Sequence, residues 1–198
     1  MAELGFQVIG VDVDQAKVDR LQSGRVPFFE PELEEVLQRN LQAGRLRFTT
    51  SFAEAGEGAD VHFICVGTPQ TPGANAADLS QVRGSVDALA PHLQPGALVV
   101  GKSTVPVGTA DELANRLAAT AGPGVEIAWN PEFLREGFAV ADTLRPDRLV
   151  IGVRSDRAEQ ILREVYQPLT EQGVPLLVMD FATAELVKVA ANSFLATK

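Results

Sequence analysis

Cysteine is almost absent from this 198-residue sequence, in which Cys65 stands alone. A single cysteine cannot close an intrachain disulfide, and such usage fits the reducing environment of the cytoplasm. The sequence also lacks any apolar run near the roughly 20 residues needed to cross a bilayer. Its first residues lack the charged and then apolar order of a signal peptide. We therefore expect a cytoplasmic protein that has no membrane partner.

Positive charge is also scarce, because 17 lysine and arginine residues stand against 26 aspartate and glutamate residues. The formal charge of −9 argues against a nucleic-acid partner, since nucleic-acid-binding domains usually carry a basic patch or a high pI. It does not exclude a phosphorylated ligand, which helix N-termini and a few basic groups can hold. The two histidines, His62 and His92, are not spaced like metal ligands, so we predict no metal site.

Apolar segments, by contrast, are plentiful and follow a regular order. Hydrophobic residues make up 45% of the chain and charged residues 22%, which is ordinary for a globular protein with a sizeable core. Short apolar runs alternate with helical periodicity, which predicts an α/β fold of βαβ units around a mostly parallel sheet. The expected strands are Gln7–Val11, Leu46–Thr49, Val61–Val66, Leu98–Lys102, Glu126–Trp129, Arg148–Gly152 and Leu176–Val178. The expected helices are Gln15–Gln22, Glu32–Ala43, Leu79–Leu93, Thr109–Ala119, Arg157–Leu169 and the segment from about Phe181 onward.

Three segments depart from this alternation. Gln70–Ala77 is rich in proline, glycine and alanine, and we expect it to be a surface loop. Met1–Gly5 has the pattern of the last turn of a helix, with Gly5 as its cap. The helical pattern after Phe181 continues to Lys198 without a stop signal. We therefore expect both ends of the sequence to be cut within a longer protein.

The first polar candidate is Asp12, which follows the expected strand Gln7–Val11. An acidic residue at the end of an early strand of an α/β unit commonly accepts hydrogen bonds from both ribose hydroxyls of a dinucleotide. The glycine-rich fingerprint that should lie about 20 residues upstream is absent from the few residues before Asp12. The alternative is an aspartate that caps the next helix, a role for which Asp14 is better placed.

Two further expected strands end in turns at the same edge of the sheet. Val61–Val66 continues into Gly67-Thr68-Pro69, a turn that exposes backbone, and Leu98–Lys102 continues into the hydroxyl residues Ser103 and Thr104. Ligands of open α/β sheets bind at this edge. An ordinary turn explains the first segment equally well.

The residues around these turns carry expectations of their own. Pro106 delays the next helix and leaves the Thr104 hydroxyl near the sheet edge, whereas Thr109 is expected to cap that helix. Cys65 lies within an apolar run, so we expect a small core residue and not a nucleophile.

Two carboxylates four residues apart, Glu132 and Glu136, follow the expected strand Glu126–Trp129. Four residues make about one helical turn, so both carboxylates can lie on one face. The alternative is a well-formed helix start, with Pro131 at the first helical position and Glu132 favoured by the helix dipole. Four motifs now follow successive strands at one edge, and this convergence indicates a site.

A lysine and an amide, Lys188 and Asn192, have the same spacing on the last helical segment. A lysine on such an apolar helix normally extends its ammonium group to solvent. If buried near ligand oxygens, it can act as an acid, a base or an oxyanion donor. The sequence leaves these alternatives open.

In combination, the motifs resemble the UDP-glucose/GDP-mannose dehydrogenase family, and within it the UDP-glucose 6-dehydrogenases. The resemblance covers essentially all 198 residues in order, and its motifs are Val11–Asp14, Phe63–Pro69, Ala77–Ser80, Lys102–Thr109, Asn130–Gly137, Arg145–Gly152 and Lys188–Lys198. The choice of UDP-glucose depends mainly on Arg145-Pro146-Asp147-Arg148. A dehydrogenase of GDP-mannose or of another UDP-sugar is the alternative.

This resemblance implies a Rossmann-like, doubly wound, mostly parallel sheet that lacks its first strand. Residues 1–180 would form an incomplete NAD-binding domain, and residues 181–198 would begin a central linking and dimerisation helix. The cofactor would be NAD and the substrate UDP-glucose or a related sugar nucleotide. The full-length protein would be a homodimer.

The resemblance also implies roles for particular residues. Asp12 would bind the adenosine ribose, with Lys17 near the same end of the cofactor. Thr104 and Glu132 would handle the water that hydrolyses a thioester. Lys188 would stabilise an alkoxide or oxyanion, and Asn192 would orient the substrate. The cofactor would further contact Val66, Gly67, Thr68, Pro69, Ser103, Thr104 and Glu136, and the substrate would contact Glu132, Phe133, Leu134, Arg135, Glu136, Lys188 and Asn192.

The family oxidises the C6 alcohol of the sugar to a carboxylate, with two NAD and a covalent thiohemiacetal on a cysteine. The family's first strand, its glycine-rich loop and its nucleophilic cysteine are absent from these 198 residues, and Cys65 does not match that cysteine. We therefore expect a fragment that does not turn over UDP-glucose by itself. A truncated binding or interaction module without catalysis is the alternative from a different functional class.

Overall fold

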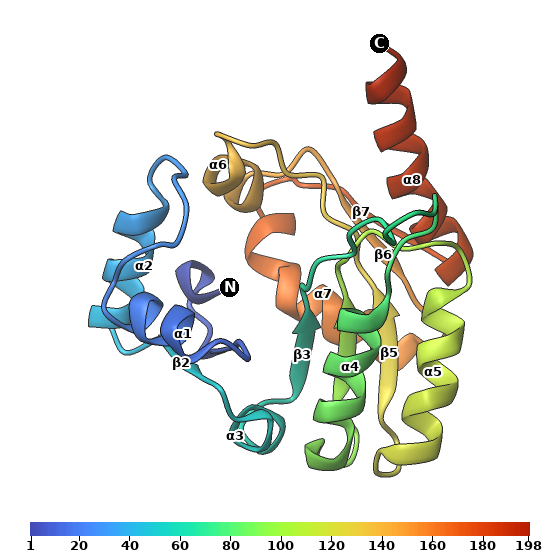
Figure 1. Cartoon of the computed structure of the whole chain (residues 1–198), viewed down its shortest axis with the longest axis horizontal. Coiled ribbons are helices and arrows are strands. Elements are labelled where there is room, and N and C mark those ends of the chain that lie inside the picture. The colour runs from blue at the N-terminus through green and yellow to red at the C-terminus, as the bar shows by residue number, and fades with distance from the viewer.

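A computed structural model describes residues 1–198 and shows strands and helices in alternation (Figure 1). The strands are β1 (Val8–Val11), β2 (Leu46–Thr49), β3 (Val61–Ile64), β4 (Leu98–Gly101), β5 (Glu126–Trp129), β6 (Leu149–Gly152) and β7 (Leu176–Met179). The α-helices are α1 (Gln15–Gln22), α2 (Leu33–Gln42), α3 (Phe52–Glu57), α4 (Ser80–Leu89), α5 (Thr109–Thr120), α6 (Ala139–Leu144), α7 (Asp156–Thr170) and α8 (Phe181–Thr197). Two 3₁₀ turns are η1 (Ala2–Leu4) and η2 (Ala90–His92).

The strands form two sheets. β1 and β2 pair in parallel, and the other five strands follow the order β3-β4-β5-β6-β7. All neighbours in the second sheet are parallel except β5 and β6, which share one antiparallel bridge between Trp129 and Gly152. In Figure 1 the two-stranded sheet stands beside β3 without joining it. The predicted α/β class and mostly parallel strands are confirmed.

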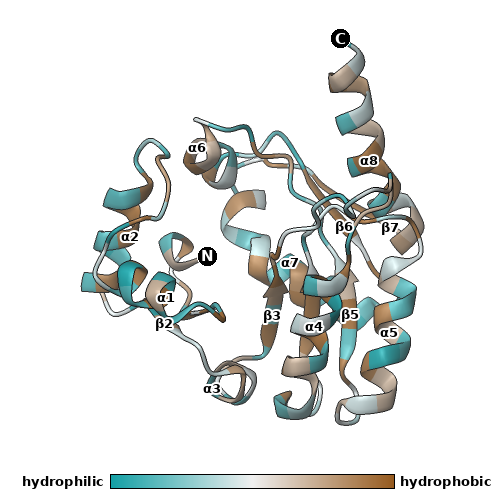
Figure 2. Cartoon of the chain, viewed as in Figure 1, coloured by the Kyte–Doolittle hydropathy of each residue, from teal (hydrophilic) through white to brown (hydrophobic).

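Helices cover both faces of the five-stranded sheet, and this explains why its strands are almost continuously apolar. On one face Val99 packs in a cluster with Leu113 of α5. On the other face Leu98 and Val100 pack in a second cluster with Leu162 of α7. All four residues of β4 are buried. Figure 2 shows the same contrast, with β3 largely apolar and the outer helices α1 and α2 largely hydrophilic.

Most predicted elements are present, with ends that differ by a few residues. Gly5 closes η1 in the left-handed region, at φ 98°, as the cap pattern predicts. Two short helices, α3 and α6, were not predicted. Each of these helices has six residues, which are too few for a clear helical period, and each begins where a side chain caps its backbone N–H groups. The Ser51 hydroxyl accepts from the Glu54 amide at α3, and Glu30 accepts from the Gly137 and Ala139 amides at α6.

The interpretation of Asn130–Gly137 as a helix start is wrong, because no residue of this segment is helical. The Glu132 carboxylate accepts from the backbone N–H of Leu134 at 2.6 Å. Such a local side-chain bond offers the backbone an alternative to the helical hydrogen bond. Glu132 and Glu136 therefore do not share a helix face.

The N-terminus of α5 is capped from a distant part of the chain, so the prediction that Thr109 caps it is wrong. The Thr109 hydroxyl instead donates to the Pro106 carbonyl oxygen at 2.7 Å. The two oxygens of Glu185 accept from the backbone N–H groups of Gly108 at 2.7 Å and of Ala110 at 2.6 Å. Glu185 is only 1% exposed. Its two buried hydrogen bonds therefore connect α8 to the N-terminus of α5.

Helix α8 is buried at its beginning and exposed toward its end. Phe181, Ala184, Glu185 and Lys188 are buried, whereas Phe194 is 70% exposed. In Figure 1 the end of α8 projects beyond the rest of the chain. No helix of the protein is both long enough and apolar enough to cross a membrane.

Candidate functional site

A cavity of about 2150 Å³ lies between the two sheets and extends to the carboxyl ends of β1, β3, β4 and β5. Ligands of open α/β sheets bind outside these strand ends. Among the candidate residues, those lining the cavity are Asp12, Lys17, Val66, Gly67, Glu132, Phe133, Leu134, Arg135, Lys188 and Asn192. Those that do not line it are Thr68, Pro69, Ser103, Thr104 and Glu136.

Asp12 lies at the end of β1 and forms an ion pair with Lys17, in which Oδ2 and Nζ are 2.5 Å apart. Its other oxygen accepts from the Asp14 backbone N–H at 3.1 Å. Burial opposes ionisation of Asp12, but the bonds from Lys17 and Asp14 outweigh it and lower the pKa of Asp12. Asp14 caps α1 by accepting from the Ala16 and Lys17 amides. Asp12 is thus an ionised acceptor that does not cap the helix.

Two loops that follow β3 and β4 are tied together by hydroxyl groups. The Ser103 hydroxyl donates to the Val66 carbonyl oxygen at 2.6 Å, and the Thr68 hydroxyl donates to the Thr104 carbonyl oxygen at 2.7 Å. The Thr104 hydroxyl makes no hydrogen bond of its own. A Cβ at Gly67 would meet only a Gln81 side-chain oxygen, at 3.8 Å, so a ligand can approach this backbone closely.

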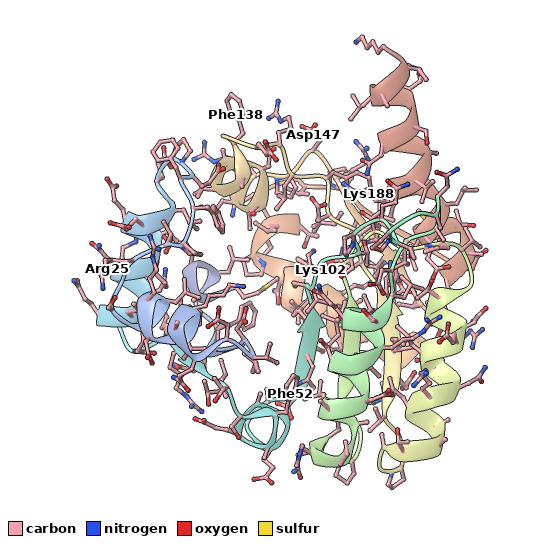
Figure 3. The ribbon with its side chains drawn as sticks, viewed as in Figure 1. Arg25, Phe52, Lys102, Phe138, Asp147 and Lys188 are labelled. Atoms are coloured by element: carbon pink, nitrogen blue, oxygen red, sulfur yellow. The ribbon has the colours of Figure 1, made fainter.

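Lys188 of α8 lies against Glu132 of the loop after β5. Its Nζ is 3.0 Å from Glu132 Oε1 and 5.3 Å from the centre of the Phe133 ring. Lys188 is only 7% exposed, so its ammonium group does not extend to bulk solvent. Figure 3 shows Lys188 and Lys102 at the same end of the sheet. Asn192 follows one turn later on α8 and is exposed.

The rest of the carboxylate-rich loop turns toward solvent. Arg135 is exposed and pairs with Asp142 at 2.7 Å. Leu134 and Glu136 are also exposed. Of the two carboxylates four residues apart, only Glu132 reaches the buried lysine.

A buried polar cluster beneath this loop was missed by the sequence analysis. Asn130 Oδ1 accepts from Lys102 Nζ at 2.8 Å and from the Tyr166 hydroxyl at 2.5 Å. The Asn130 amide donates to the Val150 carbonyl oxygen at 2.8 Å. Burial lowers the pKa of Lys102 and raises the pKa of Tyr166. Lys102 and Asn130 belong to motifs that the sequence contains, but no signal joins Tyr166 to them.

Cys65 was expected in the core, and that prediction is wrong because its side chain is exposed and lines the cavity. It follows β3, whose edge toward β1 is uncovered. Protein atoms around the thiol nevertheless desolvate it and raise its pKa. A thiol with a raised pKa is a poor nucleophile at neutral pH.

These groups fit part of a dinucleotide and part of a reacting centre. Asp12 can accept from ribose hydroxyls, and Gly67 leaves room for a ligand beside its backbone. Lys188 can donate to an oxygen that gains negative charge, and Glu132 can take up a proton. No Gly-x-Gly-x-x-Gly occurs in the sequence, so this chain offers no such loop for a diphosphate. No group of three or more histidine, cysteine, aspartate or glutamate residues is arranged to hold a metal ion.

Comparison with known proteins places these features in a family. A family model described as "UDP-glucose/GDP-mannose dehydrogenase family, NAD binding domain" matches residues 1–170. The UDP-glucose 6-dehydrogenase of Rhizobium meliloti is 45% identical over 201 residues, with 100% of this chain and 46% of the relative covered. The UDP-glucose 6-dehydrogenase YwqF of Bacillus subtilis is 42% identical, with 100% and 44% covered. The chain thus spans about half the length of these relatives.

Solved structures agree with the sequence comparison. A UDP-glucose dehydrogenase from Pyrobaculum islandicum has a TM-score of 0.93 and 45% identity, with 98% of this chain and 45% of that chain covered. A GDP-mannose dehydrogenase from Pseudomonas aeruginosa has the same TM-score with 33% identity, and 99% and 46% are covered. The identity is thus higher to the UDP-glucose dehydrogenase than to the GDP-mannose dehydrogenase. With the match over residues 1–170 and this shared fold, the chain belongs to the UDP-glucose/GDP-mannose dehydrogenase family and carries its NAD binding domain.

Proposed function

We propose that this chain is the NAD-binding half of a UDP-glucose 6-dehydrogenase, a cytoplasmic enzyme that oxidises UDP-glucose to UDP-glucuronate. The observation that carries the proposal is the ion pair between the buried Lys188 and the half-buried Glu132, 3.0 Å apart, which lines the same cavity as the ionised Asp12. This arrangement supports an acid/base centre close to a dinucleotide site. NAD, when bound, accepts the hydride from the sugar alcohol.

We assign the residues the roles that the family resemblance implies. Asp12 holds the adenosine ribose through its hydroxyls, and Lys17 keeps that carboxylate ionised. Lys188 donates to the substrate oxygen that becomes negative and stabilises it electrostatically. Glu132 and the free hydroxyl of Thr104 orient the water for thioester hydrolysis, and Asn192 orients the sugar.

Further contacts complete the proposed site. On the cofactor side the backbone after β3 and the loop after β4 lie beside the dinucleotide, through Val66, Gly67, Thr68, Pro69, Ser103 and Thr104. On the substrate side the loop after β5 contributes Phe133, Leu134 and Arg135. Glu136, on the same loop, is assigned a contact with both the cofactor and the substrate.

Residues 1–180 constitute the NAD-binding domain in this proposal, and residues 181–198 begin a helix that links to a further domain. The exposed apolar side chains of Leu186, Phe194 and Leu195 on α8 support a helix that pairs with a second subunit. The complete enzyme is accordingly a homodimer that binds a sugar nucleotide.

By itself the chain is expected to be catalytically inactive. The thioester chemistry needs a reactive cysteine, and the one cysteine present, Cys65, has a thiol whose pKa is raised. The test mixes the purified chain with NAD and UDP-glucose and follows NADH absorbance. Sustained NADH formation that Glu132→Gln abolishes would contradict the proposed inactivity.

Cofactor binding gives a second, independent test. We expect the chain to bind NAD more tightly than NADP in isothermal titration calorimetry, because the Asp12 carboxylate repels a 2′-phosphate. Asp12→Asn should weaken NAD binding and reduce the preference over NADP. Asp19→Asn is the matched control, since Asp19 is an exposed carboxylate on α1 outside the cavity lining. Equal effects of the two substitutions would refute the ribose-binding role of Asp12.

A further inference from the structure

Tyr166 of α7 and Lys102, which directly follows β4, are polar side chains to which the proposed function gives no role. Both donate to the same atom, Asn130 Oδ1, from the Tyr166 hydroxyl at 2.5 Å and from Lys102 Nζ at 2.8 Å. An amide oxygen has two lone pairs, so these two donors use its full capacity. Asn130 and Tyr166 are both buried, so neither finds a replacement partner in bulk water.

The other groups of Asn130 are bonded as well. Its side-chain NH₂ group donates to the Val150 carbonyl oxygen of β6 at 2.8 Å. Its backbone N–H donates to the Gly101 carbonyl oxygen of β4, also at 2.8 Å. These bonds hold Asn130 against β4, β6 and α7. Within this set, the bond from Tyr166 can be removed by one substitution that changes neither a backbone group nor a charge.

The position of Asn130 determines that of Glu132, because only Pro131 separates them. Proline fixes its own φ at about −65° and restricts the residue before it to extended conformations. Pro131 is buried, so an outward movement of this segment would expose apolar surface. Glu132 Oε1 lies 3.0 Å from Lys188 Nζ, while Oε2 accepts from the Leu134 N–H at 2.6 Å. A displacement of Asn130 would therefore move the Glu132 carboxylate relative to Lys188.

We propose that Tyr166 is a positioning residue, which acts through Asn130 to hold the Glu132 carboxylate against the Lys188 ammonium group. The inference rests on the proposed function, in which Glu132 and Lys188 act on the substrate. Reacting groups must be held within about 0.5 Å of their productive geometry. The segment that carries Glu132 is neither helix nor strand. Tyr166 connects it to α7, a helix that packs on the five-stranded sheet.

A purely structural hydroxyl is the alternative. The Tyr166 ring packs in an apolar cluster with Ile151 and Leu162, where a buried hydroxyl needs an acceptor. If Asn130 is that acceptor and nothing more, loss of the hydroxyl lowers stability without affecting Lys188. A direct acid or base role fits poorly, because burial raises the pKa of Tyr166 and its hydroxyl already donates to Asn130.

The accessibility of the Lys188 amine distinguishes these roles. The lysines of the chain are Lys17, Lys102, Lys188 and Lys198. Brief treatment with acetic anhydride followed by mass spectrometry gives the acetylation rate of each, with Lys198 at the exposed end of α8 as the reference. Tyr166→Phe removes the hydroxyl and keeps the ring. If that one hydrogen bond holds Glu132 in place, Lys188 should be acetylated about fivefold faster relative to Lys198.

Leu162→Val is the matched control. Leu162 lies one turn before Tyr166 on α7, in the same apolar cluster, and its side chain makes no polar contact. Loss of a buried methylene should destabilise the chain about as much as loss of one hydrogen bond. We expect the ratio of Lys188 to Lys198 acetylation to stay at its unsubstituted value. Equal rises in the two variants, or no rise in Tyr166→Phe, would overturn the proposal.

A double substitution tests the route through Glu132. Glu132→Ala removes the partner of Lys188 and should by itself speed acetylation of Lys188. Because Tyr166 affects Lys188 only through Glu132, adding Tyr166→Phe should then change the rate no further. Effects that multiply, as they do for independent sites, would contradict the proposed route.

These measurements need neither NAD nor a sugar nucleotide, so they are separate from the tests of the proposed function. A chain that does not bind NAD but shows the expected Lys188 rates would refute that function and leave the positioning contact standing. If Tyr166→Phe does not fold, hydrogen exchange of the unsubstituted chain decides. The side-chain NH₂ protons of Asn130 should exchange about tenfold or more slowly than those of the exposed Asn115. Equal exchange rates would overturn the proposal.

Discussion

Replacing Glu185 by glutamine is expected to destabilise the protein strongly, although it changes only one side-chain oxygen to an amide. Both carboxylate oxygens accept from backbone N–H groups, of Gly108 and Ala110. Gly108 has a left-handed conformation at φ 98° and supplies no side-chain cap for α5. Glutamine keeps one acceptor and turns an NH₂ group toward the other N–H, which is then left buried without a partner.

The magnitude follows from two contributions. A hydrogen bond to a charged group contributes about 1.5–3 kcal/mol, and one of the two is lost. The negative charge beside the α5 N-terminus contributes about 0.3–2 kcal/mol, and it is lost as well. We therefore expect a loss of about 2–5 kcal/mol from an unfolding free energy of roughly 5–15 kcal/mol. For a chain of this length, the thermal midpoint should fall by roughly 4–20 °C.

Urea denaturation followed by circular dichroism measures this loss. Glu159→Gln is the matched control, because Glu159 lies in the first turn of α7 but is partly exposed and pairs with Arg163 on the same helix. Such a pair contributes about 0.3–0.5 kcal/mol. If Glu185→Gln and Glu159→Gln lose the same free energy at equal m-values, the capping role of Glu185 is wrong.

Three further predictions concern buried positions. Burial lowers the pKa of His62 below its ordinary value of 6.5, so the unfolded state binds more protons than the folded state. The stability of the protein should therefore fall as the pH drops below about 6.5. Between about pH 8 and pH 5, the thermal midpoint of His62→Phe should fall less than that of the unsubstituted chain. Burial also lowers the pKa of Lys102, so stability should rise as the pH rises toward 10.5, and Lys102→Met should remove that rise in urea titrations. A Cβ at Gly101 would lie 2.0 Å from the Trp129 ring, so Gly101→Ala should lower the free energy of unfolding by about 1–3 kcal/mol or more; an unchanged denaturation midpoint would contradict this packing.

Periodicity and strand-end chemistry were enough to predict the βαβ order and the edge at which the site lies. Continuous apolar runs such as Leu98–Gly101 have few alternatives to a strand covered on both faces. The carboxyl ends of parallel strands share one edge, so the sequence predicts that Asp12 and Gly67 lie at that edge, and both residues line the cavity.

The features that were not predicted depend on contacts between distant residues. Glu185 caps a helix that starts 76 positions earlier in the chain, at Thr109, and no local pattern marks that bond. Tyr166 reaches Asn130 only because α7 packs over β5 and β6. The local pattern at Glu132 favoured a helix. In the structure the Leu134 backbone N–H donates to the Glu132 carboxylate, and the segment is not helical. Cys65 has the sequence environment of a core residue, but the strand edge beside it is open.

The spacing of Glu185 and Lys188 on α8 has a consequence for how this helix tolerates insertions and deletions. The two side chains reach different partners, the α5 N-terminus and Glu132, from positions less than one turn apart. One residue inserted between them would rotate Lys188 by about 100° and advance it by about 1.5 Å, so only one of the two contacts could form. An insertion beyond Asn192, where α8 is exposed, would leave both contacts intact. These two contacts therefore fix the number of residues between Glu185 and Lys188 and place no constraint on the length of the segment after Asn192.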